Sequence, residues 1–102
     1  MLLAQEACVS SLEELRELVY QTLCSYDQLE PGVFSMTERI LVRNGKPCGV
    51  HFCLHGPRRV KYTSIWETDG NTILYYGPTG ERFHRMQLIS APTIPNGSGD
   101  CR

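Results

Sequence analysis

The sequence lacks the features of a membrane-spanning or disulfide-rich protein. Its uninterrupted apolar runs are only a few residues long, whereas a membrane-spanning helix needs roughly 20. The first residues have no basic region followed by a sustained apolar stretch. The five cysteines are an odd number with no CxxC spacing, which argues against a disulfide framework. We therefore expect an intracellular chain, cytoplasmic or nuclear, with reduced thiols and no membrane association.

An excess of charge of one sign is also missing. The chain has 10 Lys and Arg against 11 Asp and Glu, so its formal net charge is −1. This balance gives no global attraction to nucleic acid or to anionic membranes. A length of 102 residues leaves room for one domain, and a hydrophobic content of 41% is that of an ordinary globular chain. Any functional argument from charge must therefore concern a local patch.

A helix is predicted near residues 11–27. Ser10 followed three residues later by Glu13 matches a capping box. Apolar side chains then recur at helical spacing, while charged ones fall on the other side. The apolar stripe consists of Leu12, Leu15, Leu18, Val19, Leu23 and Tyr26. The pattern predicts an amphipathic helix that covers one face of a sheet.

From residue 34 onward the hydrophobic period changes from 3.6 to 2, which indicates strands. The turn signals between them are Asn44-Gly45, Gly56-Pro57, Asp69-Gly70 and Pro78-Thr79-Gly80. The predicted strands cover 34–43, 48–55, 59–67, 72–76 and 82–88. The last of these has no clearly apolar face. We expect an α+β fold in which one N-terminal helix packs on a four- to five-stranded antiparallel β-meander.

The predicted domain covers residues 10–89. Residues 1–9 show no clear period and are expected to form a flexible N-terminus. Residues 90–102 contain two prolines and two glycines in a stretch without hydrophobic period, so a disordered tail is expected there.

Strand alternation and loop length assign the side chains to two faces. Odd-length loops keep even-numbered residues on one face across the first three strands, with Leu54 opposite Val60. A four-residue loop at 68–71 places Trp66 opposite Ile73, so the inward positions become odd on the fourth strand. The predicted core face comprises Phe34, Met36, Ile40, Val42, Val50, Phe52, Leu54, Val60, Tyr62 and Trp66.

The opposite face is predicted to be open, because a single helix can cover only one face. It combines a basic patch with an apolar and aromatic patch, and such a surface can mark an interaction site. The partner-binding residues are predicted to be Arg39, Arg43, Arg59, Lys61, Ile65, Leu74 and Tyr76. We expect a non-enzymatic protein–protein interaction module, an adaptor or regulatory subunit. Its partner would be another protein or, in the simplest version, a second copy in a homodimer.

The alternative from a different class is single-stranded nucleic acid on the same face. Cations would contact phosphates and Tyr76 would stack on a base. The cations are few and the net charge is nearly neutral, so protein binding is favoured.

His51, Cys53 and His55 alternate along one predicted strand and point to the same side. Zinc can use such ligands, but no fourth ligand is evident and neighbouring cations would repel a metal. Cys53 is the one candidate nucleophile beside a base. Histidines two residues away on a strand lie roughly 7 Å from it, too far for a hydrogen bond. We therefore predict no metal, no cofactor and no enzymatic activity.

The segment Ile40-Leu41-Val42-Arg43, followed by Val60-Lys61-Tyr62 and Arg82-Phe83, faintly resembles the arginine-bearing strand of SH2 phosphotyrosine-binding domains and the segments after that strand, over about half of the chain. The resemblance implies a phosphopeptide pocket that uses Arg43. The sequence departs from that pattern in three places. Residues 44–47 form a turn rather than a Ser/Thr-rich loop, Tyr62 stands where a histidine is usual, and no second helix comes after Leu88. Membership of that family is therefore not assigned.

Overall fold

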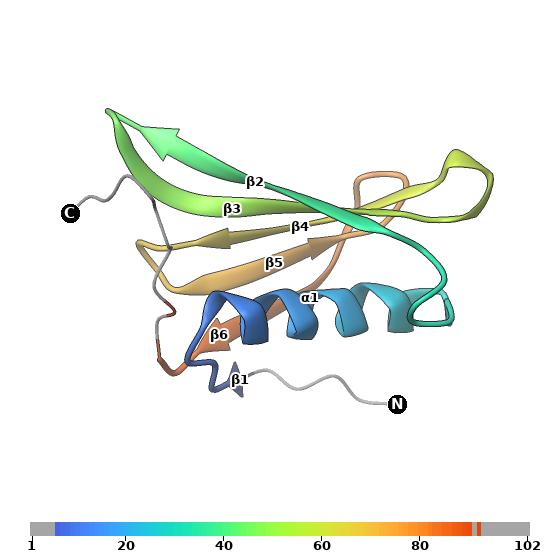
Figure 1. The fold of residues 1–102 in the computed structure, drawn as a ribbon, viewed down its shortest axis with the longest axis horizontal. Coiled ribbons are helices and arrows are strands. Elements are labelled where there is room, and N and C mark those ends of the chain that lie inside the picture. Colours follow the sequence, from blue (N-terminus) through green and yellow to red (C-terminus); the bar gives the residue numbers. More distant parts are fainter. Residues whose placement is uncertain (1–5, 91, 93–102) are drawn as a thin grey trace.

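The computed structural model describes residues 6–90 and 92, in which one helix packs on one sheet (Figure 1). The elements are β1 (Glu6–Ala7), α1 (Leu12–Tyr26), β2 (Met36–Arg43), β3 (Lys46–His55), a 3₁₀ turn (Pro57–Arg59), β4 (Lys61–Glu67), β5 (Thr72–Tyr76) and β6 (Arg82–Leu88). The strand order is β1-β6-β5-β4-β3-β2, with β2 to β6 forming an antiparallel meander. The predicted α+β class is confirmed, with six strands in place of four to five.

Strand β1 is the addition. It pairs in parallel with β6, with Glu6 opposite Gln87 and Ala7 opposite Leu88. The sequence predicts no element before residue 10, because two residues are too short to show a period. Ser90 also makes a hydrogen bond, donating to the carbonyl of Val9 at 2.6 Å. The rest of the predicted tail, apart from residue 92, lies outside the described residues.

The helix begins one residue later than the capping prediction. Ser11 is the N-cap, and its hydroxyl accepts a hydrogen bond from the Glu14 backbone N–H at 3.1 Å. The Glu14 carboxylate in turn accepts from the Ser10 N–H at 2.9 Å. Assignment of the cap to Ser10 with Glu13 is therefore wrong. Two adjacent serines followed by two adjacent glutamates fit the same motif in either register.

The predicted stripe of α1 faces the sheet. Leu15, Val19 and Leu23 are fully buried, and Leu18 is half-buried. Tyr26 at the end of the helix is 36% exposed and stacks on Phe83 of β6, with ring centroids 4.0 Å apart. Each fully buried side chain of the stripe stabilises the fold by about 1.5 to 3 kcal/mol, which makes α1 a main source of stability.

The predicted inward parity is confirmed on β3, β4 and β5. Trp66 lies opposite Ile73, as predicted, and both are buried. The pairing of Leu54 with Val60 is wrong, since Leu54 lies opposite Tyr62. The loop between the strands has five residues instead of three. Because both lengths are odd, the inward face is unchanged.

Strand β6 has an inward face that the sequence does not reveal. Tyr75 pairs with His84 but Tyr76 pairs with Arg82, which leaves Phe83 as an extra residue. This β-bulge breaks the alternation in the first half of the strand. Beyond it Met86 and Leu88 are buried in the core.

Two residues of the predicted core face are exposed. Ile40 is 39% exposed and Val42 is 61% exposed, so their assignment to the core is wrong. Both lie on β2, and Figure 1 shows the β2–β3 hairpin rising away from α1 toward its tip. Strand parity places them on the helix side of the sheet, but the helix does not reach them.

Candidate protein-binding face

The sheet face opposite α1, called here the open face, carries side chains in straight rows across the strands. Registers between neighbouring strands determine which residues share a row, because directly opposed residues point to the same side. The central row contains Arg39 of β2, His51 of β3, Ile65 of β4, Leu74 of β5 and Arg85 of β6. Ile65 and Leu74 are half-buried, while both arginines are exposed. The row therefore places an apolar pair between two cations.

A second row, called the tyrosine row, runs beside the central one. It contains Thr37, Cys53, Thr63, Tyr76 and Arg82. Beyond it Lys61 lies opposite His55. Their positions in the strand registers place the ring of Tyr76 next to the apolar pair and add two cations, Arg82 and Lys61, to this face.

The row on the other side of the central row, called the acidic row, contains Leu41, Gly49, Glu67, Thr72, Gln87 and Glu6. Gly49 has no side chain, and an added Cβ would collide with the carbonyl oxygen of Trp66. A hollow of about 240 Å³ lies here, lined in part by Leu41, Ile65 and Glu67. The open face therefore has a hollow beside the apolar pair Ile65 and Leu74.

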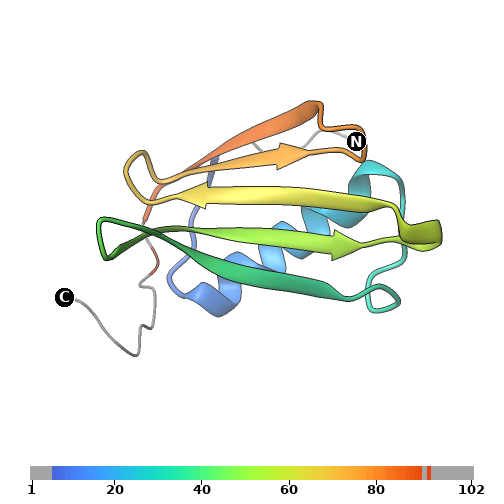
Figure 2. The ribbon, with the colours of Figure 1, turned by 90° about the horizontal axis from the view of Figure 1, so that it is seen from above.

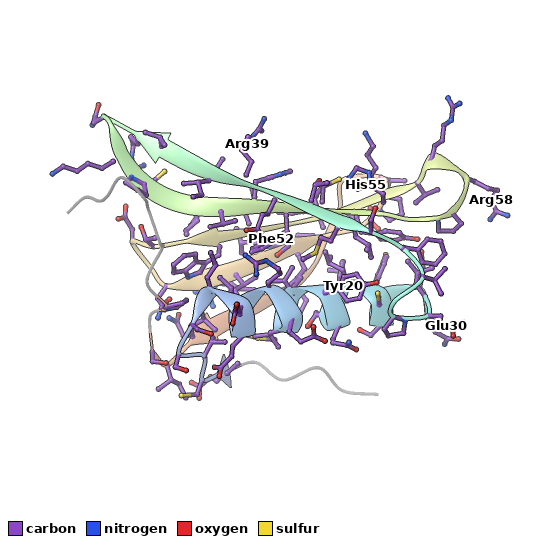
Figure 3. The ribbon with its side chains drawn as sticks, viewed as in Figure 1. Tyr20, Glu30, Arg39, Phe52, His55 and Arg58 are labelled. Atoms are coloured by element: carbon purple, nitrogen blue, oxygen red, sulfur yellow. The ribbon has the colours of Figure 1, made fainter. Side chains whose placement is uncertain are left out.

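The predicted site residues are only partly brought together. Arg39, Ile65 and Leu74 share the central row, with Tyr76 in the next row and Lys61 beyond it. Figure 3 shows Arg39 pointing away from α1, on the opposite side of the sheet from the helix. The three apolar and aromatic residues form the single patch that the sequence predicts.

The other two predicted residues lie at opposite ends of the sheet. Arg43, near the tip of the β2–β3 hairpin, is ion-paired with Asp69 at 2.9 Å, and both side chains are mostly exposed. Arg59 is not in a strand. It belongs to the turn after β3 and has a left-handed φ of 65°. Its predicted place in a strand on the binding face is therefore wrong.

Two cations of the open face are absent from the sequence-based prediction. Arg85 lies opposite Leu74 and Arg82 lies opposite Tyr76, so both border the apolar patch. The sequence does not reveal them because the bulge at Phe83 hides which residues of β6 point outward. The position of the bulge is the information needed to assign Arg82 and Arg85 to the open face, and the hydrophobic pattern of β6 does not give it.

Charge on the open face is segregated. Arg43 of this face is ion-paired with Asp69 in the loop before β5. Among the residues of the described strands, the other cations of the open face are Arg39, Lys46, Lys61, Arg82 and Arg85, and its acids are Glu6 and Glu67. Both acids belong to the acidic row, so the central and tyrosine rows carry positive charge alone. Burial and the nearby Arg39 guanidinium both lower the pKa of His51, which keeps its imidazole neutral near pH 7. The net positive charge therefore comes from Arg and Lys.

The three candidates for metal or thiol chemistry, His51, Cys53 and His55, lie in three different rows of β3. His55 shares a hydrogen bond with the Thr37 hydroxyl at 3.0 Å. Within the described part of the chain, no group of three or more His, Cys, Asp or Glu residues is arranged to hold a metal ion.

Comparisons with protein-family models, curated proteins and solved structures find no match for this chain. None of the helices in the described ranges is sufficiently long and apolar to cross a membrane.

Proposed function

We propose that the chain is a non-enzymatic protein-interaction module that binds a partner protein through its open face. The observation that supports this most directly is the central row, in which half-buried Ile65 and Leu74 lie between exposed Arg39 and Arg85. Interfaces typically combine an apolar centre with a polar rim in which arginine is enriched. In the described residues, α1 covers the other side of the sheet and nothing covers this one (Figure 1).

The charge of the open face favours an acidic partner. Arg39 and Arg85 are separated by four inter-strand steps of about 4.8 Å, or roughly 19 Å in total. An extended segment of about six residues spans that distance. The fitting partner segment therefore has acidic residues at both ends and bulky apolar side chains between them. Two copies of this chain placed face to face would bring their arginines together, so a different protein is the better partner here.

A substitution in the centre of the patch tests the proposal. Leu74→Asp adds a negative charge where the apolar pair meets the partner, and Val33→Asp is the matched control. Val33 is 59% exposed and lies in the loop before β2, away from the open face. An extract of the source organism is passed over the immobilised wild type and both variants. A protein that binds the wild type and Val33→Asp but not Leu74→Asp is then purified, and its affinity for each is measured by calorimetric titration. We expect at least about tenfold weaker binding for Leu74→Asp, since centrally placed apolar contacts carry most binding energy.

Salt dependence separates this function from nucleic-acid binding. A single-stranded nucleic acid bound through phosphate contacts loses affinity steeply as salt rises. A protein contact centred on Ile65 and Leu74 loses affinity only gradually. Retention of nucleic acid rather than protein, with a steep salt slope, would replace the proposal by the alternative. If Leu74→Asp and Val33→Asp retain the partner protein equally, the open face is not the binding surface.

A further inference from the structure

Within the described residues, strand β2 has no neighbouring strand on its outer side. It is one of the two edge strands and has eight residues, whereas β1 at the other edge has only two. Figure 2 shows β2 as the outermost strand at its side of the sheet. A long edge strand presents backbone N–H and C=O groups that can pair with another chain.

The structure of β2 keeps this edge available. The strand contains no proline, and the irregularity next to Leu41 arises from an extra residue on β3, because Leu41 pairs with Gly49 while Val42 pairs with Pro47. β2 itself is therefore continuous. It also carries Ile40 and Val42, exposed on the helix side, where the proposed partner of the open face would not cover them.

We propose that the edge of β2 pairs with β2 of a second copy, antiparallel, about a two-fold axis beside Ile40. This inference goes beyond the proposed function, since it uses a different surface and a different partner. When two copies join their sheets edge to edge through the same strand, a two-fold axis perpendicular to the sheet relates them, and the two strands run antiparallel. It keeps both helices on the same side.

Charge selects one register. Opposed residues must share a face, so even-numbered residues of β2 pair with even-numbered ones and odd with odd. Among the registers that join five or more β2 residues, one opposes Glu38 to Glu38, one Arg39 to Arg39, and one Arg39 to Arg43. Like charges directly opposite each other are destabilising. The remaining register opposes Ile40 to Ile40 and Arg39 to Leu41, and it pairs seven residues of each strand.

The charges near this axis are already compensated on the helix side. Glu38 accepts two hydrogen bonds from the Arg16 guanidinium of its own α1, at 2.6 and 2.8 Å. In the selected register Glu38 lies opposite Val42 of the second copy, so no acid meets an acid. The pairing would bury part of the apolar surface of Ile40 and Val42. It would also place the two open faces side by side, which gives the dimer two equivalent binding faces.

Cysteine cross-linking tests the register. With Ile40→Cys the two thiols face each other across the axis, within the Cα separation of about 4.4 to 6.8 Å that a disulfide needs. Val42→Cys is the matched control. It is the more exposed position, but in this register the two copies are four residues apart along the strand, roughly 13 Å. Wild type with its native cysteines gives the background.

Under oxidised glutathione, we expect at least about tenfold more disulfide-linked dimer from Ile40→Cys than from Val42→Cys. Random collision would favour the more exposed Val42→Cys, so equal or reversed yields overturn the register. Sedimentation over a roughly hundredfold concentration range then tests the dimer itself. Wild type should shift toward dimer. Ile40→Lys should stay monomeric and should have the melting temperature that the wild type shows at the lowest concentration, because dimer formation itself raises the melting temperature. A wild type that remains monomeric throughout overturns the proposal, and the open-face function would be unaffected by that result.

Discussion

Replacement of two valines by alanine measures how far the core extends toward the β2–β3 hairpin tip. Val42 and Val50 have the same side chain on neighbouring strands, and the sequence assigns both to the core face. In the structure Val50 is fully buried and Val42 is 61% exposed. The two substitutions remove the same two methyl groups, so a difference in their effect reports on burial alone.

The expected difference follows from the area that leaves water. Each buried methyl or methylene group contributes about 0.8 kcal/mol, so Val50→Ala loses about 1.6 kcal/mol from transfer and about 2 to 3 kcal/mol once the cavity is included. Val42→Ala should change the free energy of unfolding by less than about 0.5 kcal/mol, as exposed substitutions usually do.

Urea denaturation followed by the fluorescence of buried Trp66 measures both variants. With a urea dependence of about 1 to 3 kcal/mol per molar, Val50→Ala should lower the midpoint by about 0.7 to 3 M. The measurement is made at a low protein concentration, which disfavours self-association. Comparable destabilisation by both variants would refute the conclusion that the hairpin tip is not packed on α1.

Three further predictions concern polar groups near the core. Tyr62→Phe removes the hydrogen bond that the Tyr62 hydroxyl donates to Asp27 at the end of α1, at 2.6 Å, so unfolding in urea should show a loss of about 0.5 to 1.5 kcal/mol. A double-mutant cycle with Asp27→Asn that shows no coupling would contradict that contact. Burial raises the pKa of both Tyr62 and Tyr75 to about 12, above the unfolded value of about 10. Their contribution is therefore complete below about pH 10 and lost as the pH rises toward 12, so thermal stability should fall over that window and Tyr62→Phe should fall less steeply. Ser64 is fully buried and, within the described residues, its hydroxyl has no hydrogen-bond partner. Ser64→Ala should leave the melting temperature unchanged or raise it, and a marked decrease would indicate a partner for that hydroxyl.

The helix and the central strands could be predicted because local signals decide them. The change of hydrophobic period from 3.6 to 2 separates α1 from the sheet, and the turn dipeptides mark where the hairpins lie. Loop length then decides which side chains share a face, which is why Ile65, Leu74 and Arg39 are grouped correctly. The predicted pairing of β3 with β4 is wrong by two residues, but the assignment of side chains to the two faces is unchanged because a shift of two keeps the parity.

The remaining features depend on geometry that one strand cannot show. β1 is held by pairing with a segment about 80 residues away along the chain. The bulge at Phe83 hides the outward position of Arg85 on β6. The rise of the β2–β3 hairpin away from α1 exposes Val42, because a strand longer than the helix can cover must extend beyond it. In each case the missing information is tertiary rather than local.

The affinity of a purified partner for Arg85→Glu tests directly whether the open face is the binding surface, because Arg85 is one of the two cations that only the structure assigns to that face. Arg58→Glu is the control, because it changes the net charge equally in the turn at the end of the sheet (Figure 3). Loss of a rim charge that faces an acidic partner should weaken binding by about tenfold or more. We predict that Arg85→Glu shows this loss and that Arg58→Glu does not. Equal affinities for both variants and wild type would contradict the assignment of the open face as the binding surface.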